Sequence, residues 1–126
     1  MLSDYQVYPT IPTSDLEAAR PFYEDVLGFV PRDVNPRGIF YDAGDGTYIA
    51  VTLSSGRPSG SHTQAGFRVK DLDALVADLQ GRGVTFEEYE TPKTVNGVAT
   101  LPIGKAAWFK DPDGNLFGLL QFDYEG

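Results

Sequence analysis

The sequence has no cysteine, only one histidine and one tryptophan, and no long apolar run. Without cysteine there is neither a disulfide framework nor a thiol nucleophile. No stretch approaches the roughly 20 apolar residues of a membrane span, and no apolar run follows a basic N-terminus as in a signal peptide. The 10 Lys and Arg are outnumbered by 18 Asp and Glu, and phosphate binding needs a basic face. We therefore expect a cytoplasmic protein with no nucleic-acid or membrane partner.

The chain contains two diverged copies of one pattern. TSDLEAARPFYEDVLGF begins at Thr13, and the similar VKDLDALVADLQGRGVTF begins at Val69. IFYDAGDGTYIAV, from Ile39, resembles AWFKDPDGNLFGL, from Ala107, at a larger offset. The second copy is therefore longer, and we place its extra residues in the segment 91–105. A polar linker (54–61) joins a first module (1–55) to a second (61–126) within one domain, 1–126.

Each copy predicts a strand, a helix and three strands. The alternation in YQVYPTIP predicts a first strand over residues 5–12, and Ser14 with Glu17 predicts a capping box for the first helix. Pro21 should disturb that helix, and the second helix should begin at Asp71. The residues expected to be buried on the two helices are Leu16, Ala19, Tyr23, Val26, Leu27, Leu72, Leu75, Val76 and Leu79. Two βαβββ modules predict an α+β fold whose curved mixed sheet leaves an open cleft.

The doubled pattern resembles the vicinal oxygen chelate superfamily, which includes glyoxalase I, extradiol dioxygenases and bleomycin-resistance proteins. The resemblance rests on SDLEAARPFYEDVLGF and WFKDPDGNLFGLLQ, with GFRVKDLDALVADLQGRGV between them, and covers nearly the whole chain. It is specific for the fold and not for a reaction, because the superfamily carries many reactions.

The resemblance implies four metal-ligand positions, where family enzymes carry His and Glu. They fall on Tyr8 and Gln64, and on Ala50 and Gly118. None of these is the His, thiolate or carboxylate that Zn, Ni, Fe and Mn sites need. His62, the only histidine, lies two residues before Gln64, and we interpret it as a rim residue. We therefore expect no metal and no cofactor, and the sequence identifies no catalytic residue.

The other cleft positions predict a binding site for a small aromatic ligand. Alternation groups six candidates by face, whereas the sides of Phe40 and Trp108 depend on hairpin parity, which the sequence leaves open. We expect Trp108 to stack on the ligand, with Ala50 and Gly118 leaving space and the segment 91–105 closing as a lid. The expected ligand-binding residues are Tyr8, Thr10, Phe40, Tyr48, Ala50, Thr52, Gln64, Arg68, Trp108 and Gly118.

Three functions remain open at this point. The leading hypothesis is a metal-free binding protein of the bleomycin-resistance type, which sequesters an aromatic or antibiotic-like ligand and so confers antibiotic resistance. The alternative is a glyoxalase-, dioxygenase- or isomerase-like enzyme with a non-standard or absent metal site. In the third, the cleft serves protein association. Open sheet edges, and the pairing of small members in the family it resembles, predict a homodimer.

Overall fold

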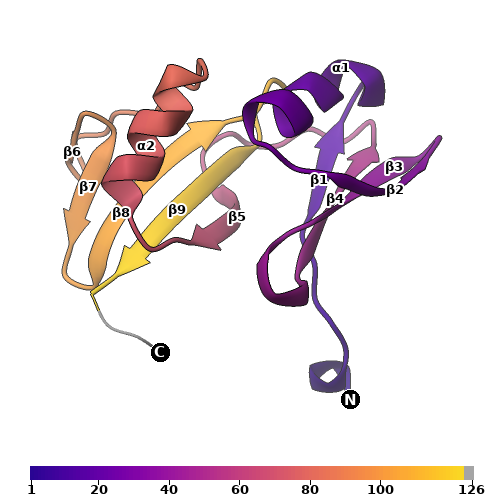
Figure 1. The fold of residues 1–126 in the computed structure, drawn as a ribbon, viewed down its shortest axis with the longest axis horizontal. Coiled ribbons are helices and arrows are strands. Elements are labelled where there is room, and N and C mark those ends of the chain that lie inside the picture. Colours follow the sequence, from indigo (N-terminus) through magenta and orange to yellow (C-terminus); the bar gives the residue numbers. More distant parts are fainter. Residues whose placement is uncertain (124–126) are drawn as a thin grey trace. The chain divides into compact units, whose positions relative to one another are not determined.

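Each half of the chain folds around its own mixed β-sheet, with a helix on one face (Figure 1). The computed structural model describes residues 1–123, in a first unit, Met1–Pro58, and a second unit from Ser59 onward. The first sheet has four strands and the second has five. The predicted α+β fold of two modules is confirmed, with one sheet in each module. None of the helices found in residues 1–123 has the length and apolarity of a transmembrane span.

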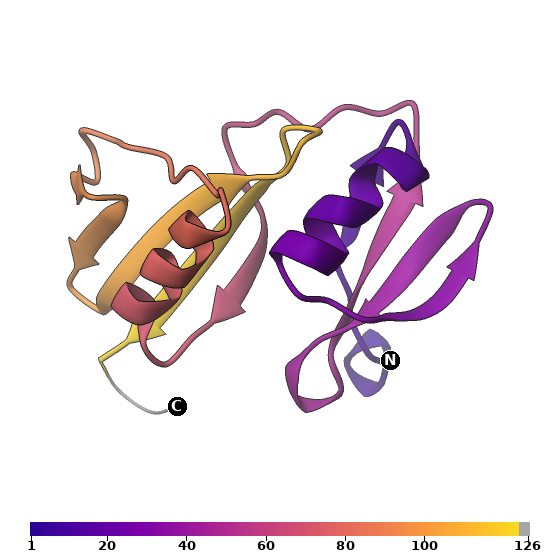
Figure 2. The ribbon, with the colours of Figure 1, turned by 45° about the horizontal axis from the view of Figure 1, so that its top comes forward.

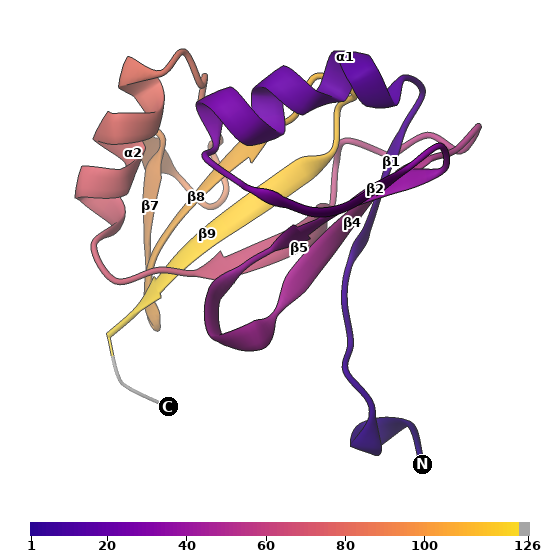
Figure 3. The same ribbon diagram turned by 45° about the vertical axis from the view of Figure 1, so that its right-hand side comes forward.

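The first unit follows the predicted order of strand, helix and three strands. Its elements are η1 (Leu2–Asp4), β1 (Thr10–Thr13), α1 (Leu16–Arg20), η2 (Pro21–Val26), β2 (Pro31–Asn35), β3 (Gly38–Asp42), η3 (Gly44–Gly46) and β4 (Tyr48–Leu53). The strand order is β1-β4-β3-β2, with β1 parallel to β4 and the other pairs antiparallel. Residues 1–7 form an exposed arm that runs away from this sheet (Figure 3).

The second unit repeats this order and adds one short strand. Its elements are β5 (Thr63–Arg68), α2 (Leu72–Gly81), β6 (Thr94–Val95), β7 (Val98–Leu101), β8 (Gly104–Lys110) and β9 (Leu116–Phe122). The strand order is β5-β9-β8-β7-β6, with β5 parallel to β9. Figure 2 shows α2 lying across one face of this sheet.

The strand pairings reproduce both offsets of the sequence repeat. Ala50 on β4 pairs with Phe40 on β3, and Gly118 on β9 pairs with Trp108 on β8, so these pairs are related by the offset of the two Asp-Gly segments. On the other side, Ala50 pairs with Thr10 and Gly118 pairs with Gly66. Thr10 and Gly66 are related by the offset that also separates Thr13 from Val69. The internal repeat read from the sequence is therefore a repeat of strand register.

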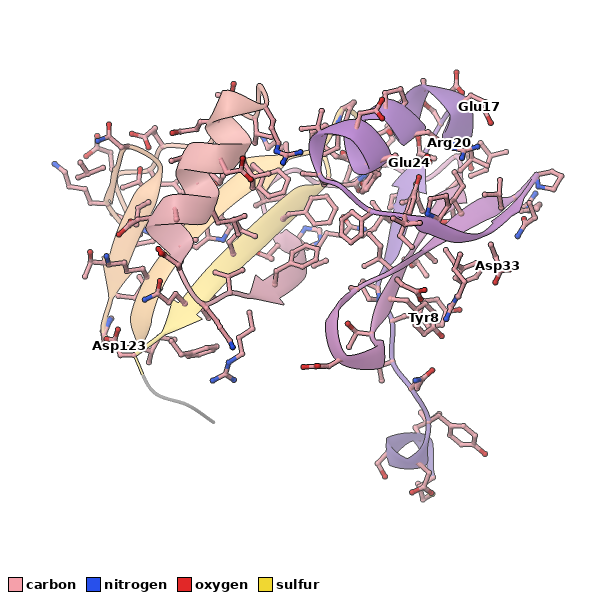
Figure 4. The ribbon with its side chains drawn as sticks, in the orientation of Figure 1. Tyr8, Glu17, Arg20, Glu24, Asp33 and Asp123 are labelled. Atoms are coloured by element: carbon pink, nitrogen blue, oxygen red, sulfur yellow. The ribbon has the colours of Figure 1, made fainter. Side chains whose placement is uncertain are left out.

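The helical face of the first sheet is an aromatic core. Tyr23 on η2 stacks on Tyr41 of β3 at 5.7 Å between ring centroids, and both side chains are fully buried. The Tyr41 hydroxyl donates to Glu24 at 2.9 Å, and the same carboxylate accepts a 2.6 Å bond from Arg20 Nε (Figure 4). Burial, followed by this hydrogen bond, raises the pKa of Tyr41, while the bond from Arg20 lowers the pKa of Glu24. The polar atoms that the core encloses are thus satisfied by one another.

The first strand and the first helix begin later than predicted. β1 starts at Thr10, and Val7 is 86% exposed, because the chain before Tyr8 lies in the arm and not on the sheet. Asp15, not Ser14, is the helix N-cap, and its carboxylate accepts from the Ala18 N–H at 3.1 Å. A carboxylate satisfies the same orphan donor as a hydroxyl and also complements the helix dipole.

Pro21 changes the winding of the first helix. The α-helical turn ends at Arg20, and the chain continues as a π-helical turn from Pro21 to Val26. The N–H of Leu27 donates to the carbonyl of Phe22 at 2.9 Å, five residues back. The wider turn accommodates a residue that has no N–H of its own to donate.

The insertion in the second module forms part of a hairpin, so the loop predicted over 91–105 is wrong, and its closing over a ligand stays a prediction. β6 and β7 lie inside this segment and pair with each other, and β7 pairs with β8 at the edge of the sheet. Asn96 and Gly97 make the turn with φ of 51° and 80°. An Asn-Gly pair with two positive φ angles is a preferred two-residue hairpin turn.

The core of the second unit lies between α2 and one sheet face. Leu72, Val76 and Leu79 on α2 are buried as predicted, whereas Leu75 is only half-buried. On the sheet, Phe109 and Phe117 stack at 5.5 Å between ring centroids. Phe109 and Phe117 point toward α2, and their strand neighbours Trp108 and Gly118 therefore point to the opposite, open face of the sheet.

Candidate functional site

Six of the predicted ligand-binding residues lie on the open face of the first sheet. Pairing places Thr10, Phe40 and Ala50 side by side, and Tyr48 and Thr52 follow by alternation along β4. Their neighbours in the sequence point to the other face, which is buried against the helix. Tyr8 precedes β1, and Figure 4 places it on the side of the sheet away from α1. The structure therefore brings these six together within one unit.

Three of the six form a closed aromatic cluster. Tyr8 stacks on Tyr48 at 4.7 Å between ring centroids, and Phe40 lies 6.1 Å from Tyr8 and 6.0 Å from Tyr48. The guanidinium of Arg32 lies 4.7 Å from the centre of the Tyr48 ring and is held by Asp42 at 3.2 Å. Because these aromatic rings already pack on one another and on Arg32, this surface offers a ligand little free aromatic area.

On the open face of the second sheet, Trp108 covers Gly118. A Cβ added at Gly118 would lie 3.3 Å from Trp108 Nε1 and 3.2 Å from Thr63 Cγ2, which is closer than ordinary contact. The expectation that Gly118 leaves open space is therefore wrong, since the indole occupies that space. Glycine at this position allows the indole to lie against the sheet.

Gln64 and Arg68 do not line the pocket that contains Trp108. The register of β5 against β9 shifts between Thr63 and Ala65, so Gln64 is the extra residue of a bulge and Thr63 lies beside Gly118. Arg68 keeps the predicted face, and its guanidinium lies 4.3 Å from the centre of the Phe122 ring. A bulge offsets the alternation by one residue, which sequence alternation alone does not reveal.

Trp108 forms one wall of a pocket of about 370 Å³, hereafter the Trp108 pocket. Tyr89 meets Trp108 edge to face at 5.6 Å between ring centroids. The pocket is lined by Gly60, Ser61, Thr63, Glu87, Tyr89, Thr91, Pro92, Trp108, Lys110 and Leu116. Of these, the sequence predicted Trp108 as a ligand-binding residue and placed Thr91 and Pro92 in the segment expected to close over the ligand. Glu87 and Tyr89 were missed because the segment 86–90 reaches β8 through a single bridge, Phe86 to Phe109, which carries no strand signal.

An ion pair lies beside the two aromatic rings of the Trp108 pocket. Glu87 Oε1 is 3.3 Å from Lys110 Nζ, and the Glu87 N–H donates to the Trp108 carbonyl at 2.8 Å. Burial raises the pKa of Tyr89, and the charge of Glu87 raises it further. The phenol is therefore kept neutral beside the indole, as a stacking platform with a hydrogen-bonding tip.

A second pocket of about 360 Å³ lies within the first unit, at the start of α1. It is lined by Ser14, Asp15, Leu16, Glu17, Val34, Asn35, Pro36, Ile39 and Leu53. This lining has no aromatic side chain, and the Asp15 carboxylate is already used to cap the helix. The Trp108 pocket is therefore the better candidate for an aromatic ligand.

Comparison with known proteins identifies the family. Residues 6–119 match the model of the Glyoxalase/Bleomycin resistance protein/Dioxygenase superfamily. The chain belongs to this superfamily. Its name spans enzymes and resistance proteins, so membership alone does not decide between catalysis and binding. No curated protein sequence matches the chain significantly.

Solved structures of the superfamily resemble the chain over almost its full length. TnmS3, an antibiotic binding protein from Streptomyces sp. CB03234, is 33% identical, with 94% of this chain and 97% of that chain covered and a TM-score of 0.70. A superfamily member from Sphaerobacter thermophilus is 33% identical, with coverages of 93% and 96% and a TM-score of 0.72. A bleomycin resistance determinant encoded on transposon Tn5 is 21% identical, with coverages of 95% and 99% and a TM-score of 0.73, and it supports the fold alone.

The residues at the family's metal-ligand positions do not fit a metal. Ala50 and Gly118 have no donor atom, and the volume that a Glu side chain at 118 would need holds the Trp108 indole. The exposed ring of His62 contacts the Ser59 hydroxyl through Nδ1. Across residues 1–123, no cluster of three or more His, Cys, Asp or Glu side chains is placed to hold an ion. No chemical step is therefore assigned to a metal at these positions.

Proposed function

We propose that this protein binds a small aromatic or antibiotic-like molecule and sequesters it, with no metal and without transforming it. The Trp108 pocket supplies the binding wall, with Tyr89 edge to face against the indole at an interplanar angle of 73°. Protein of this kind would act in the cytoplasm as a homodimer. The sequence similarity to an antibiotic binding protein, at 33% identity over nearly the full length, supports this proposal.

The observation that carries the proposal is the packing of Trp108 over Gly118. The indole lies close to Gly118 through Nε1 and Cδ1, where any longer side chain would displace it, and it also lines the pocket. A planar ligand that packs against the indole gains on the order of 1 kcal/mol from aromatic pairing, in addition to the burial of its apolar area. A fixed platform also reduces the entropy that is lost on binding.

The test uses the single indole N–H resonance of the protein, which belongs to Trp108. Titration with a planar aromatic probe, 2-naphthamide, should shift this resonance in a saturable way. Tyr89→Ala should weaken binding several-fold, whereas Tyr5→Ala, which changes an exposed tyrosine of the N-terminal arm, should leave it unchanged. Binding of the probe with no shift of the indole resonance, and equal affinity of the two variants, would place the ligand site elsewhere.

The enzymatic alternative makes a different prediction for the same protein. A glyoxalase-, dioxygenase- or isomerase-like enzyme would consume its substrate, whereas a binding protein returns the ligand unchanged. Recovery of the intact probe after denaturation of the complex, quantified by mass spectrometry, supports sequestration. Turnover that depends on an added divalent metal would support the enzyme.

A further inference from the structure

The two charged side chains that line the Trp108 pocket, Glu87 and Lys110, form an ion pair with each other. Lys110 lies two residues after Trp108 on β8, so the two side chains project from the same face of the sheet. Glu87 is anchored through its own N–H to the Trp108 carbonyl at 2.8 Å. Both residues line the pocket together with Tyr89.

Both members of the pair retain hydrogen-bonding capacity for a ligand. An ammonium group has three donors and a carboxylate has about four lone-pair sites, and their mutual contact uses one of each. The side chains of Lys110 and Glu87 are 40% and 28% exposed, so neither is sealed inside the protein. The pocket therefore presents a donor and an acceptor side by side, and the two charges sum to zero.

We infer that the ligand is an uncharged planar aromatic molecule with a hydrogen-bond acceptor and a donor on the same edge, as in an aromatic primary amide. This inference rests on the proposed function. The ligand acceptor receives a hydrogen bond from Lys110 Nζ, its donor bonds to the Glu87 carboxylate, and its ring packs on Trp108. An anion gains from Lys110 what it loses to Glu87, and a cation gains from Glu87 what it loses to Lys110, so neither has a net attraction to offset the loss of its hydration. A neutral donor–acceptor edge satisfies both groups without breaking their pair.

Four naphthalenes that differ only in the substituent at position 2 test the inference. They are the carboxamide, the methyl ketone, the carboxylate and the aminomethyl cation. The carboxamide should bind wild-type protein most tightly, by roughly tenfold over the ketone, because the carboxamide, unlike the ketone, can also donate a hydrogen bond to the Glu87 carboxylate. Affinities are measured from the Trp108 indole resonance, which none of the probes obscures.

Two variants should reverse the ranking. Lys110→Met leaves Glu87 alone and should favour the cation, while Glu87→Gln leaves Lys110 alone and should favour the carboxylate, each by about tenfold relative to wild type. Lys105→Met is the matched control, because Lys105 lies on the same strand and pairs at 2.8 Å with Asp73 of α2, outside the pocket. This control should keep the wild-type ranking.

The outcomes separate the inference from the function on which it rests. If all four probes bind with equal affinity, or if the ranking does not respond to Lys110→Met and Glu87→Gln, the inference is wrong and the aromatic pocket stands. If none of the four moves the indole resonance, both fail. The wild-type ranking decides the question even where melting curves show that a variant does not fold.

Discussion

Substitution of Gly118 by alanine is the smallest change that tests how the candidate site is built. The added methyl carbon would lie 3.3 Å from Trp108 Nε1, 3.4 Å from Trp108 Cδ1 and 3.2 Å from Thr63 Cγ2. These separations are a few tenths of an ångström below ordinary carbon contact, so either the indole or the strand must move. The strand is the stiffest of these, because β9 is held on both sides by β5 and β8, so the indole and the Thr63 side chain should move.

The expected change in the free energy of unfolding of Gly118→Ala is the difference between a packing cost and an entropy gain. Overpacking of this kind typically costs about 1–3 kcal/mol, whereas replacing a strand glycine by alanine returns about 0.5–1 kcal/mol of backbone entropy. The free energy of unfolding should therefore fall by about 1 kcal/mol, which lowers the melting temperature by about 4 °C in a domain of this size. Displacement of the indole should also weaken binding of the naphthalene carboxamide by up to about tenfold.

Gly66→Ala provides the matched control for this prediction. Gly66 pairs directly with Gly118 on the adjacent strand, and a Cβ there would meet nothing closer than the Gly118 carbonyl oxygen at 4.0 Å. This variant should keep the indole resonance of the wild type and melt at the same temperature or slightly higher. The indole resonance, the melting temperature and the probe affinity are measured on both variants. If the two behave alike in all three, the packing of Trp108 on Gly118 does not shape the site.

Three further predictions concern pH, metal and assembly. The neutral form of Tyr41 is favoured in the folded state because its pKa is raised above the usual 10.0, so this contribution to stability is complete below pH 10 and is lost as the pH rises beyond it. The melting temperature of the wild type should therefore fall more steeply above pH 10 than that of Tyr41→Phe. Elemental analysis of purified protein should find less than one divalent metal per chain, and one chelator-resistant metal per chain would contradict the assignment of the ligand positions. Light scattering should give a mass near twice that of the 13.8 kDa chain, and a monomer at micromolar concentration would refute the dimer.

Strand register was predictable from the sequence because the chain repeats itself. The offset between the two Asp-Gly segments aligned Ala50 with Gly118 and Phe40 with Trp108, and the observed pairings agree. Buried positions on α2 were also predictable, since periodicity and the Asp71 cap agree with one another. The side on which Trp108 falls could not be deduced, because alternation fixes neighbours relative to each other and not relative to the helix.

The parts of the site that escaped prediction depend on irregular backbone. Because of the bulge at Gln64, Thr63 and not Gln64 lies beside Gly118, and no local residue predicts this shift of register. Glu87 and Tyr89 reach the site from a segment whose only bridge to the sheet is a single residue pair. Such contacts are set by tertiary packing, and propensity and periodicity do not encode them. The Asn-Gly turn at residues 96 and 97 did carry a hairpin signal, and the length of the insertion concealed it.

The lack of a carboxylate at position 118 and the presence of tryptophan at position 108 have the same structural cause. The two positions pair directly across β8 and β9, and the indole fills the volume that a longer side chain at 118 would need. A Glu at 118 therefore favours a smaller residue at 108, and Trp108 in its observed position favours glycine at 118. It follows that Gly118→Glu should lower the melting temperature less in a Trp108→Ala background than in the wild type, and an equal effect in both backgrounds would contradict this shared packing. In this chain, a carboxylate at position 118 and an aromatic wall at position 108 are alternatives that compete for the same space.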